Sequence, residues 1–191
     1  MLLLAVVAVG VILGWLDGGT LRRAGRTQLR GEMLVPVVVL AHLGIYRLPL
    51  PPAVAYWAWI VSFLAFIALA LANRRLPGLP LIALGVALNL VVVVANHGMP
   101  VSVEAIRMVG GTLSALAASP VTHQLLTRAS RVALLGDLIP VSSWGPLRAI
   151  VSVGDLVMFA GLAIAVMAAM GGGIDSDVMC SGIDANIAGP S

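Results

Sequence analysis

The sequence predicts an all-α protein, a polytopic bundle of about five membrane-spanning helices with an additional interfacial or re-entrant helical segment. Of its 191 residues, 60% are hydrophobic and 10% are charged, and the mean hydropathy is +1.07. These values exceed those of a soluble domain of this length. Long apolar stretches also recur along the chain, and arginines concentrate in the short connections between them. Together these observations predict an integral membrane protein.

The five expected spans lie near the length that a bilayer requires, and they cover residues 1–16, 33–49, 52–72, 79–96 and 149–170. The first has neither a basic segment before it nor a cleavage site ahead of Trp15, so we expect it to be retained as a helix. In the second, Pro36 lies close enough to the start to be tolerated. The third begins with Tyr56, Trp57 and Trp59, which favour the headgroup level.

Residues 97–148 are expected to form one long external segment between the fourth and fifth spans. Within it, 103–126 is rich in alanine and leucine and is broken by Gly110, Gly111 and Pro120. We interpret it as one or two interfacial or re-entrant helices, although a full crossing is the alternative. Residues 1–171 would thus form one transmembrane domain, followed at 172–191 by a small, polar and flexible tail.

The arginines predict the orientation. The connection between the first two spans and the one between the third and fourth carry six of them, at positions 22, 23, 26, 30, 74 and 75. Short basic connections stay in the cytoplasm. The sequence therefore predicts a multi-pass protein of the bacterial inner membrane, with the amino terminus outside and the carboxyl terminus in the cytoplasm.

Several classes of function are disfavoured by composition. All eleven basic residues are arginine, and they form no basic patch interleaved with aromatic residues, so nucleic-acid binding is not expected. The single Cys180 cannot form an intramolecular disulfide, and no Cys/His cluster has the spacing of metal ligands. We therefore predict no metal and no tightly bound cofactor, and we expect the lipid bilayer as the surrounding partner.

Small residues recur four positions apart in two spans, at Gly10, Gly14 and Gly18 and at Gly161, Ala165 and Ala169. This spacing allows helix backbones to approach closely. The stripes indicate packing inside one bundle or, alternatively, contact with another membrane subunit or a second copy of the chain.

Polar residues inside the spans need partners. His42 in the second span and Asn89 in the fourth are expected to bond neighbouring helices, because an unpaired polar group is costly in hydrocarbon. A membrane histidine is also a candidate tetrapyrrole ligand. His42, together with the aromatic cluster near Trp57, is therefore a candidate contact for a tetrapyrrole, a quinone or a lipid.

Asp137 and Asp155 are the most informative polar residues, because an aspartate near the hydrocarbon region needs a local reason. The loop between them contains Pro140, Gly145 and Pro146, which suits a fold that brings the two carboxyls together. Two such carboxyls can share a proton and act as acid and base. In the alternative, each caps a helix turn.

The C-terminal third resembles the lipoprotein signal peptidases, which are aspartic membrane proteases. The resemblance rests on Gly136-Asp137-Leu138-Ile139, on Ser152-Val153-Gly154-Asp155 and on Gly161. It implies catalytic roles for Asp137 and Asp155, and Asn96 with Gly98 weakly mirrors an asparagine-glycine motif of that family. Ser152 stands where those enzymes have asparagine, and in place of their Asp-Arg pair only Arg128 and Arg131 are near. The residues that we assign to binding are Asn96, Gly98, Arg131 and Ser152 in the regions just described, and His42 in the second span.

Nearly the whole chain resembles an uncharacterised bacterial membrane family, catalogued as a domain of unknown function (number 5317). The shared features are the basic first connection, the Asn96-His97-Gly98-Met99-Pro100 segment, Gly136 to Pro140, and Ser152 to Asp155. This resemblance implies a fold and no activity. Three functions remain open: a non-catalytic accessory subunit, which the sequence favours, an aspartate-pair membrane hydrolase, and a quinone, lipid or tetrapyrrole binder.

Overall fold

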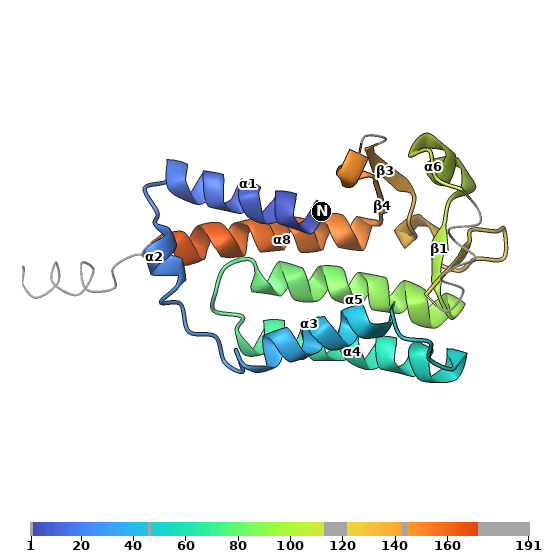
Figure 1. Cartoon of the computed structure of the whole chain (residues 1–191), viewed down its shortest axis with the longest axis horizontal. Coiled ribbons are helices and arrows are strands. Elements are labelled where there is room, and N and C mark those ends of the chain that lie inside the picture. Colours follow the sequence, from blue (N-terminus) through green and yellow to red (C-terminus); the bar gives the residue numbers. More distant parts are fainter. Residues whose placement is uncertain (1, 46, 113–121, 143–144, 172–191) are drawn as a thin grey trace, which may run out of the picture.

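The computed structural model describes residues 2–45, 47–112, 122–142 and 145–171. The predicted tail at 172–191, with Cys180, lies outside the described residues. The chain is mostly helical (Figure 1). Its main helices are α1 (Leu2–Leu16), α2 (Leu21–Ala24), α3 (Leu34–Ile45), α4 (Pro52–Ala72), α5 (Leu79–Asn96) and α8 (Val153–Met170).

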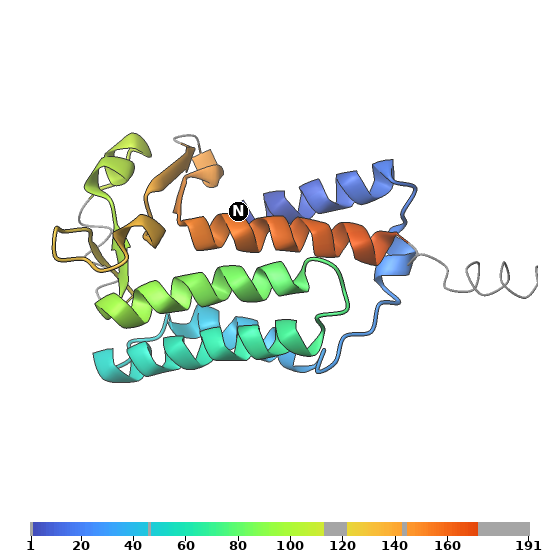
Figure 2. The ribbon, with the colours of Figure 1, turned by 180° about the vertical axis from the view of Figure 1, so that it is seen from behind.

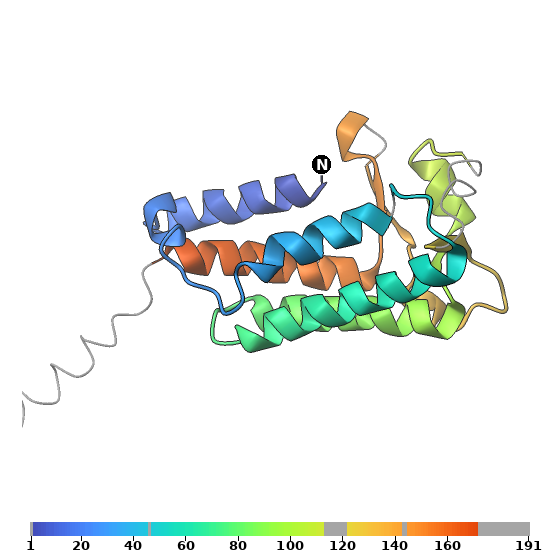
Figure 3. The same ribbon diagram turned by 60° about the horizontal axis from the view of Figure 1, so that its bottom comes forward.

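The long helices lie side by side and are roughly aligned, as the opposite views in Figures 1 and 2 show. Helix α8 packs on α1 and on α5, α5 also packs on α4, and α4 packs on α3. Figure 3 shows the same helices from another side, with α3 lying along α4. The main apolar core lies between α4 and α5 and includes Trp59, Phe63, Val86, Val92 and Val93.

Three helices are long and apolar enough to cross a membrane, namely α4, α5 and α8. They match the predicted third, fourth and fifth spans and indicate a membrane protein. The five predicted spans are not all confirmed, because α1 has 15 residues and α3 only 12. At 1.5 Å per residue, α3 is about 18 Å long, whereas the hydrocarbon core is about 30 Å thick.

The last span was predicted to start too early. Residues Ala149–Val151 form strand β4, which pairs antiparallel with β3 (Ile139–Ser142), so α8 begins only at Val153. Ser152 lies between the last residue of β4 and the first residue of α8, and it caps the helix. The apolar run at 149–151 resembles the start of a helix, but its backbone hydrogen bonds go to the neighbouring strand.

Between α5 and α8 the chain forms a small cap at one end of the bundle, seen at the right of Figure 1. Besides β3 and β4, it contains β1 (Met99–Val101), α6 (Val103–Met108) and β2 (His123–Leu125), with one-turn helices η1 (Ala133–Leu135) and η2 (Gly145–Leu147). The strictly all-α prediction is therefore wrong in this region. Strands of only three or four residues are too short to produce a recognisable alternation of apolar and polar residues.

The ends of the predicted interfacial segment meet at β1. Strand β2 pairs parallel with β1, and the Met99 amide donates to the Thr122 carbonyl at 2.8 Å. A single crossing by 103–126 would separate these residues by the thickness of the membrane. The full-crossing alternative is therefore wrong, while residues 113–121 themselves lie outside the described part of the chain.

Glycines allow the central helices to touch. A Cβ atom on Gly85 of α5 would collide with the Gly154 carbonyl of α8, and one on Gly161 would lie 2.7 Å from the Gly78 carbonyl. Likewise, a Cβ on Gly10 of α1 would lie 2.9 Å from that of Val166. Gly10, Gly14, Gly161 and Ala165 are buried, so at these positions the small residues pack inside one bundle.

We predict that Gly85→Ala strongly destabilises the protein, because the added methyl group has only backbone and the Met158 side chain against it. Overpacking of this kind costs about 1–3 kcal/mol or more. The matched control is Gly44→Ala on α3, where the nearest atom to the new methyl is the Leu48 Cδ1 at 3.6 Å. Thermal unfolding in detergent measures both variants, and equal unfolding temperatures would contradict the proposed contact.

Candidate functional site

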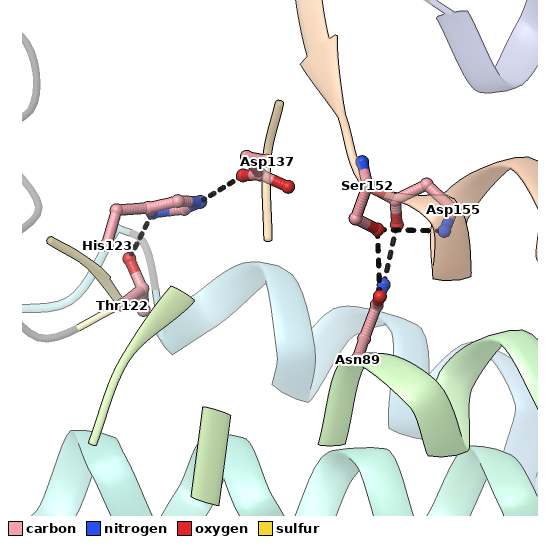
Figure 4. A network of polar contacts seen from close by, with 6 residues as sticks. All are labelled: Asn89, Thr122, His123, Asp137, Ser152 and Asp155. Carbon is pink, nitrogen blue, oxygen red and sulfur yellow. Dashed lines mark hydrogen bonds and ion pairs between the residues drawn. The ribbon is translucent and has the colours of Figure 1, made fainter. Parts of the chain in front are cut away.

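Asp155 belongs to a closed ring of hydrogen bonds between α5 and α8. Asn89 donates from Nδ2 to Asp155 Oδ1 at 2.7 Å and accepts at Oδ1 from the Ser152 hydroxyl at 2.8 Å. The Ser152 hydroxyl accepts from the Asp155 amide at 2.9 Å, and the Ser152 amide donates to Asp155 Oδ2 at 3.0 Å. Figure 4 shows the three side chains together.

This ring combines a capping box with a bond between helices. Ser152 is fully buried and caps α8, while Asp155 occupies the third helical position and returns a bond to the Ser152 amide. Asn89, which we expected to bond a neighbouring helix, does so through both atoms of its amide. The position of Asp155 thus has a structural explanation.

Asp137 lies in a different environment. Its amide donates to the Pro100 carbonyl at 2.8 Å and its carbonyl accepts from the Ser102 amide at 3.0 Å, so β1 fixes its backbone. The residue is only 7% exposed. Among the described residues, no donor lies within hydrogen-bonding distance of its carboxyl, so Asp137 does not cap a turn as one alternative expected.

The imidazole of His123 faces this carboxyl, with Nε2 3.8 Å from Oδ2. Burial and, secondarily, the charge of Asp155 raise the pKa of Asp137 to about 8. Burial lowers the pKa of His123, against a smaller opposing effect of Asp155. Asp137 and His123 therefore face each other as neutral groups near pH 7, and their contact is not an ion pair.

The two aspartates lie near one another without touching. In Figure 4, one oxygen of Asp137 points toward His123 and the other toward the group formed by Ser152 and Asp155. The charge of Asp155 acts on both Asp137 and His123. The hairpin of β3 and β4 produces this arrangement, because it turns the chain back between the two carboxylates.

A pocket of about 330 Å³ opens beside Asp137. Val101, Ile106 and Val109 give it an apolar wall, and Asp137, His123 and Arg148 supply polar groups. Asp155 does not line this pocket. The described part of the chain has no group of three or more His, Cys, Asp or Glu residues that could hold a metal ion.

Asn96 and Gly98 shape the base of the cap. The side-chain oxygen Oδ1 of Asn96 accepts a hydrogen bond from the backbone amide of Arg131 at 2.7 Å. The side-chain nitrogen Nδ2 of Asn96 donates to the backbone carbonyl of Arg131 at 2.8 Å. The Gln124 side chain donates to the Asn96 carbonyl at 2.7 Å. Asn96 and the backbone of Arg131 thus hold the cap loops on the end of α5, and Gly98 lies buried beside them.

His42 is engaged inside the bundle. The Ser62 hydroxyl donates its proton to the Trp59 carbonyl at 2.7 Å, so it accepts from His42 Nδ1 at 2.8 Å. The rings of Phe63 and Phe66 meet the imidazole edge to face. The expected bond from His42 to a neighbouring helix is therefore present, whereas Trp57 is largely exposed on α4.

Sequence reasoning missed His123 and Arg148 as site residues. His123 follows a stretch rich in alanine and serine with no recognisable motif. Only its pairing opposite Met99 on β1 places it beside Asp137. A signal was available for Arg148, since it stands directly before the strand that leads into Ser152 and Asp155.

Asp137 makes the stability of the protein depend on pH. Between about pH 4, where an unfolded aspartate titrates, and about pH 8, the folded protein binds more protons at Asp137 than the unfolded chain does. Stability from this group is therefore complete below about pH 4 and is lost as the pH rises toward 8, by at most about 1.4 kcal/mol per pH unit. His123 has the opposite effect below about pH 6.5, where the unfolded chain binds the additional proton.

We predict that Asp137→Asn removes this loss, so that the variant gains stability relative to the wild type as the pH rises from 5 to 8. The difference between the two proteins isolates Asp137 from His123. Unfolding in detergent across this pH range measures it, with exposed Asp17→Asn as the control that keeps the wild-type profile. Parallel profiles for Asp137→Asn and the wild type would contradict the raised pKa.

Comparison with known proteins gives the chain a family. A family model described as a family of unknown function (DUF5317) matches residues 26–167. An uncharacterised protein of Thermotoga maritima is 32% identical over 130 residues, which cover 64% of this chain and 73% of that relative. No solved structure matches, and the matches do not show the resemblance to lipoprotein signal peptidases. The chain belongs to the DUF5317 family of unknown function.

Proposed function

We propose that this chain is a membrane hydrolase of the aspartate-pair type, with Asp137 as the acid and Asp155 as the base. The observation that carries the proposal is the Asp137 carboxyl, which lines a pocket, faces His123 and accepts no hydrogen bond from the described residues. A carboxyl with a raised pKa, beside a pocket and a second carboxylate, is typical of a functional site.

The two carboxyls differ in the way that acid–base catalysis requires. Asp137 is protonated at neutral pH because its pKa is about 8. Asp155 receives hydrogen bonds from Asn89 and from the Ser152 amide, and these donors stabilise a negative charge. In the proposal, Asp137 holds the proton that it gives, and Asp155 supplies the second carboxyl that an acid–base pair needs.

In the proposed reaction, the Asp155 carboxylate accepts a proton from water while the water oxygen adds to a carbonyl carbon of the substrate. Asp137 gives its proton to the carbonyl oxygen. When the bond to the leaving group breaks, Asp155 returns its proton to that group, and a hydroxyl of the intermediate reprotonates Asp137. Both aspartates then recover their initial states.

The position of the site favours a lipid-linked or membrane-embedded substrate. The pocket opens in the cap that joins α5 to α8, two helices long enough to span a membrane. Its apolar wall suits a hydrophobic side chain or acyl group. Arg148 also lines the pocket, where a guanidinium group can orient an anionic part of the substrate.

We predict that the protein hydrolyses members of a mixture of acylated peptides, and that this requires both aspartates. The purified chain is incubated with the mixture in water labelled with heavy oxygen, and mass spectrometry detects products that have gained the label. Asp137→Asn and Asp155→Asn should each lose about a hundredfold or more of the labelled product, while Asp17→Asn retains it. Labelled products that persist in both aspartate variants would contradict the proposal.

A double substitution separates catalysis from folding. Asn89→Asp combined with Asp155→Asn keeps the donors and acceptors of the ring but moves the carboxylate to α5. We expect this variant to fold and to be inactive. Asp155→Asn alone should lose stability, because its new side-chain NH₂ group would face another donor, either the Asn89 NH₂ group or the Ser152 amide. Full activity in the double variant would assign Asp155 a purely structural role.

A second candidate is a non-catalytic subunit of a membrane complex, which α3 favours. None of its residues is buried, and Leu34, Val37, Leu40 and Leu43 are exposed. Since α3 is too short to cross the bilayer, one of its ends would leave unpaired backbone groups in hydrocarbon if lipid alone covered it. A protein partner or a second copy of the chain would cover α3 better.

For this candidate, a photocrosslinking residue at Val37 or Leu40 should give a discrete adduct in native membranes. Exposed Val61 and Leu64 on α4 serve as matched controls and should give none. The adducts are resolved by gel electrophoresis and identified by mass spectrometry. The subunit proposal fails if α3 and α4 positions crosslink alike, and an adduct with the chain itself would identify a homo-oligomer.

A further inference from the structure

We propose that the end of the bundle opposite the cap binds the phosphate group of an anionic lipid headgroup, through Arg23, Arg26 and Arg75. This site is independent of the proposed hydrolase activity. A hollow of about 550 Å³ opens there, where the chain leaving α1 and the connection between α4 and α5 meet the end of α8. In Figure 1, α2 lies beside this end of α8.

Two connections bring the three arginines together. Arg23 belongs to α2 and Arg26 follows it, whereas Arg75 comes from the connection after α4. All three line the same hollow, and Thr27 adds a hydroxyl group. Guanidinium groups donate paired hydrogen bonds to phosphate oxygens, which makes arginine better suited to this role than lysine.

Hydrogen bonds fix the backbone that carries these arginines. The Thr20 amide donates to the Met170 carbonyl at 2.9 Å, which attaches the start of α2 to the end of α8. The Arg30 amide donates to Asn73 Oδ1 at 2.7 Å, and Asn73 Nδ2 returns a bond to the Arg30 carbonyl at 3.1 Å. Both connections are therefore held in position before any ligand arrives.

The charge at this end is strongly positive. Six of the eleven arginines lie there, at positions 22, 23, 26, 30, 74 and 75, against the acidic residues Asp17 and Glu32. None of these six forms an ion pair with another described residue. Helices α1, α4 and α8 also end here, and their carbonyl ends attract positive charge. The helix dipoles and the preference of short basic loops for one side of the membrane are sufficient to explain exposed arginines at this end. They do not explain why three of these arginines line the same hollow.

The remaining wall favours a lipid over a free phosphate. Besides its arginines and Thr27, the hollow is lined by Asp17, which carries a carboxylate against the three guanidinium groups, and by Gly171. The rest of its wall is apolar and comes from the α4–α5 connection and from α8: Leu76, Pro77, Met167, Ala168 and Ala169. An anionic lipid places its phosphate among basic side chains and its glycerol and acyl groups against such a wall. Basic pockets between membrane helices bind anionic headgroups in this way.

The experiment compares the full chain in nanodiscs of phosphatidylcholine alone and of phosphatidylcholine with phosphatidylglycerol. The test variant combines Arg23→Gln, Arg26→Gln and Arg75→Gln. Its matched control combines Arg47→Gln, Arg107→Gln and Arg128→Gln, which removes the same charge at the cap end. Binding of phosphatidylglycerol, measured by native mass spectrometry, should weaken on the order of a hundredfold in the test variant and little in the control.

Equal losses in the two triple variants would overturn the proposal, because the effect would then be nonspecific charge attraction. Inorganic phosphate added to the protein in a neutral detergent distinguishes the source of the ligand. Failure of phosphate to raise the unfolding temperature supports a lipid headgroup. An increase that the test variant loses, without any preference for phosphatidylglycerol, would overturn the lipid assignment and identify a site for soluble phosphate compounds.

Discussion

The contact between α5 and α8 is the constraint on which the rest of the structure depends. Gly85 and Gly154 allow the two backbones to touch, and a Cβ atom on Gly154 would collide with the Asn89 amide. In a bilayer, helices gain no hydrophobic drive from contact with each other, so close dispersion contact and hydrogen bonds must hold them. The same approach lets Asn89 reach Ser152 and Asp155. Packing and the polar ring are therefore two consequences of one set of glycines.

The two aspartates lie in different environments. Asp155 has donors for both carboxyl oxygens, so its charge is compensated and α8 gains a stable start. Asp137 has neither benefit, and its proximity to Asp155 makes ionisation still more costly. A structural role would be served equally well by asparagine at position 137, whose amide is neutral at every pH. Aspartate at this position is useful when its proton is to be given to another group.

The sequence predicted the long helices well because their physics is local. Apolar length alone located α4 and α5, and prolines and glycines marked their ends. The start of α8 was misplaced because Ala149–Val151 is as apolar as the helix that follows, and only pairing with β3 distinguishes the two. Similarly, Asp137 and Asp155 could be singled out by their cost in an apolar chain, whereas His123 could not. It reaches Asp137 only because β1 pairs on one side with β2 and on the other with Asp137.

The two ends of the bundle treat charge in opposite ways, and this difference follows from how the chain enters and leaves the helices. At the cap, β1 lies between α5 and the segments that follow it, so backbone pairing buries Asp137 and leaves His123 partly buried beside it. At the other end, the chain leaving α1 and the connection after α4 meet the end of α8, and these short connections carry the arginines that line the hollow. Helix packing therefore separates the two features by the length of the bundle: Asp137 and its pocket lie at the cap end, and the three convergent arginines lie at the opposite end.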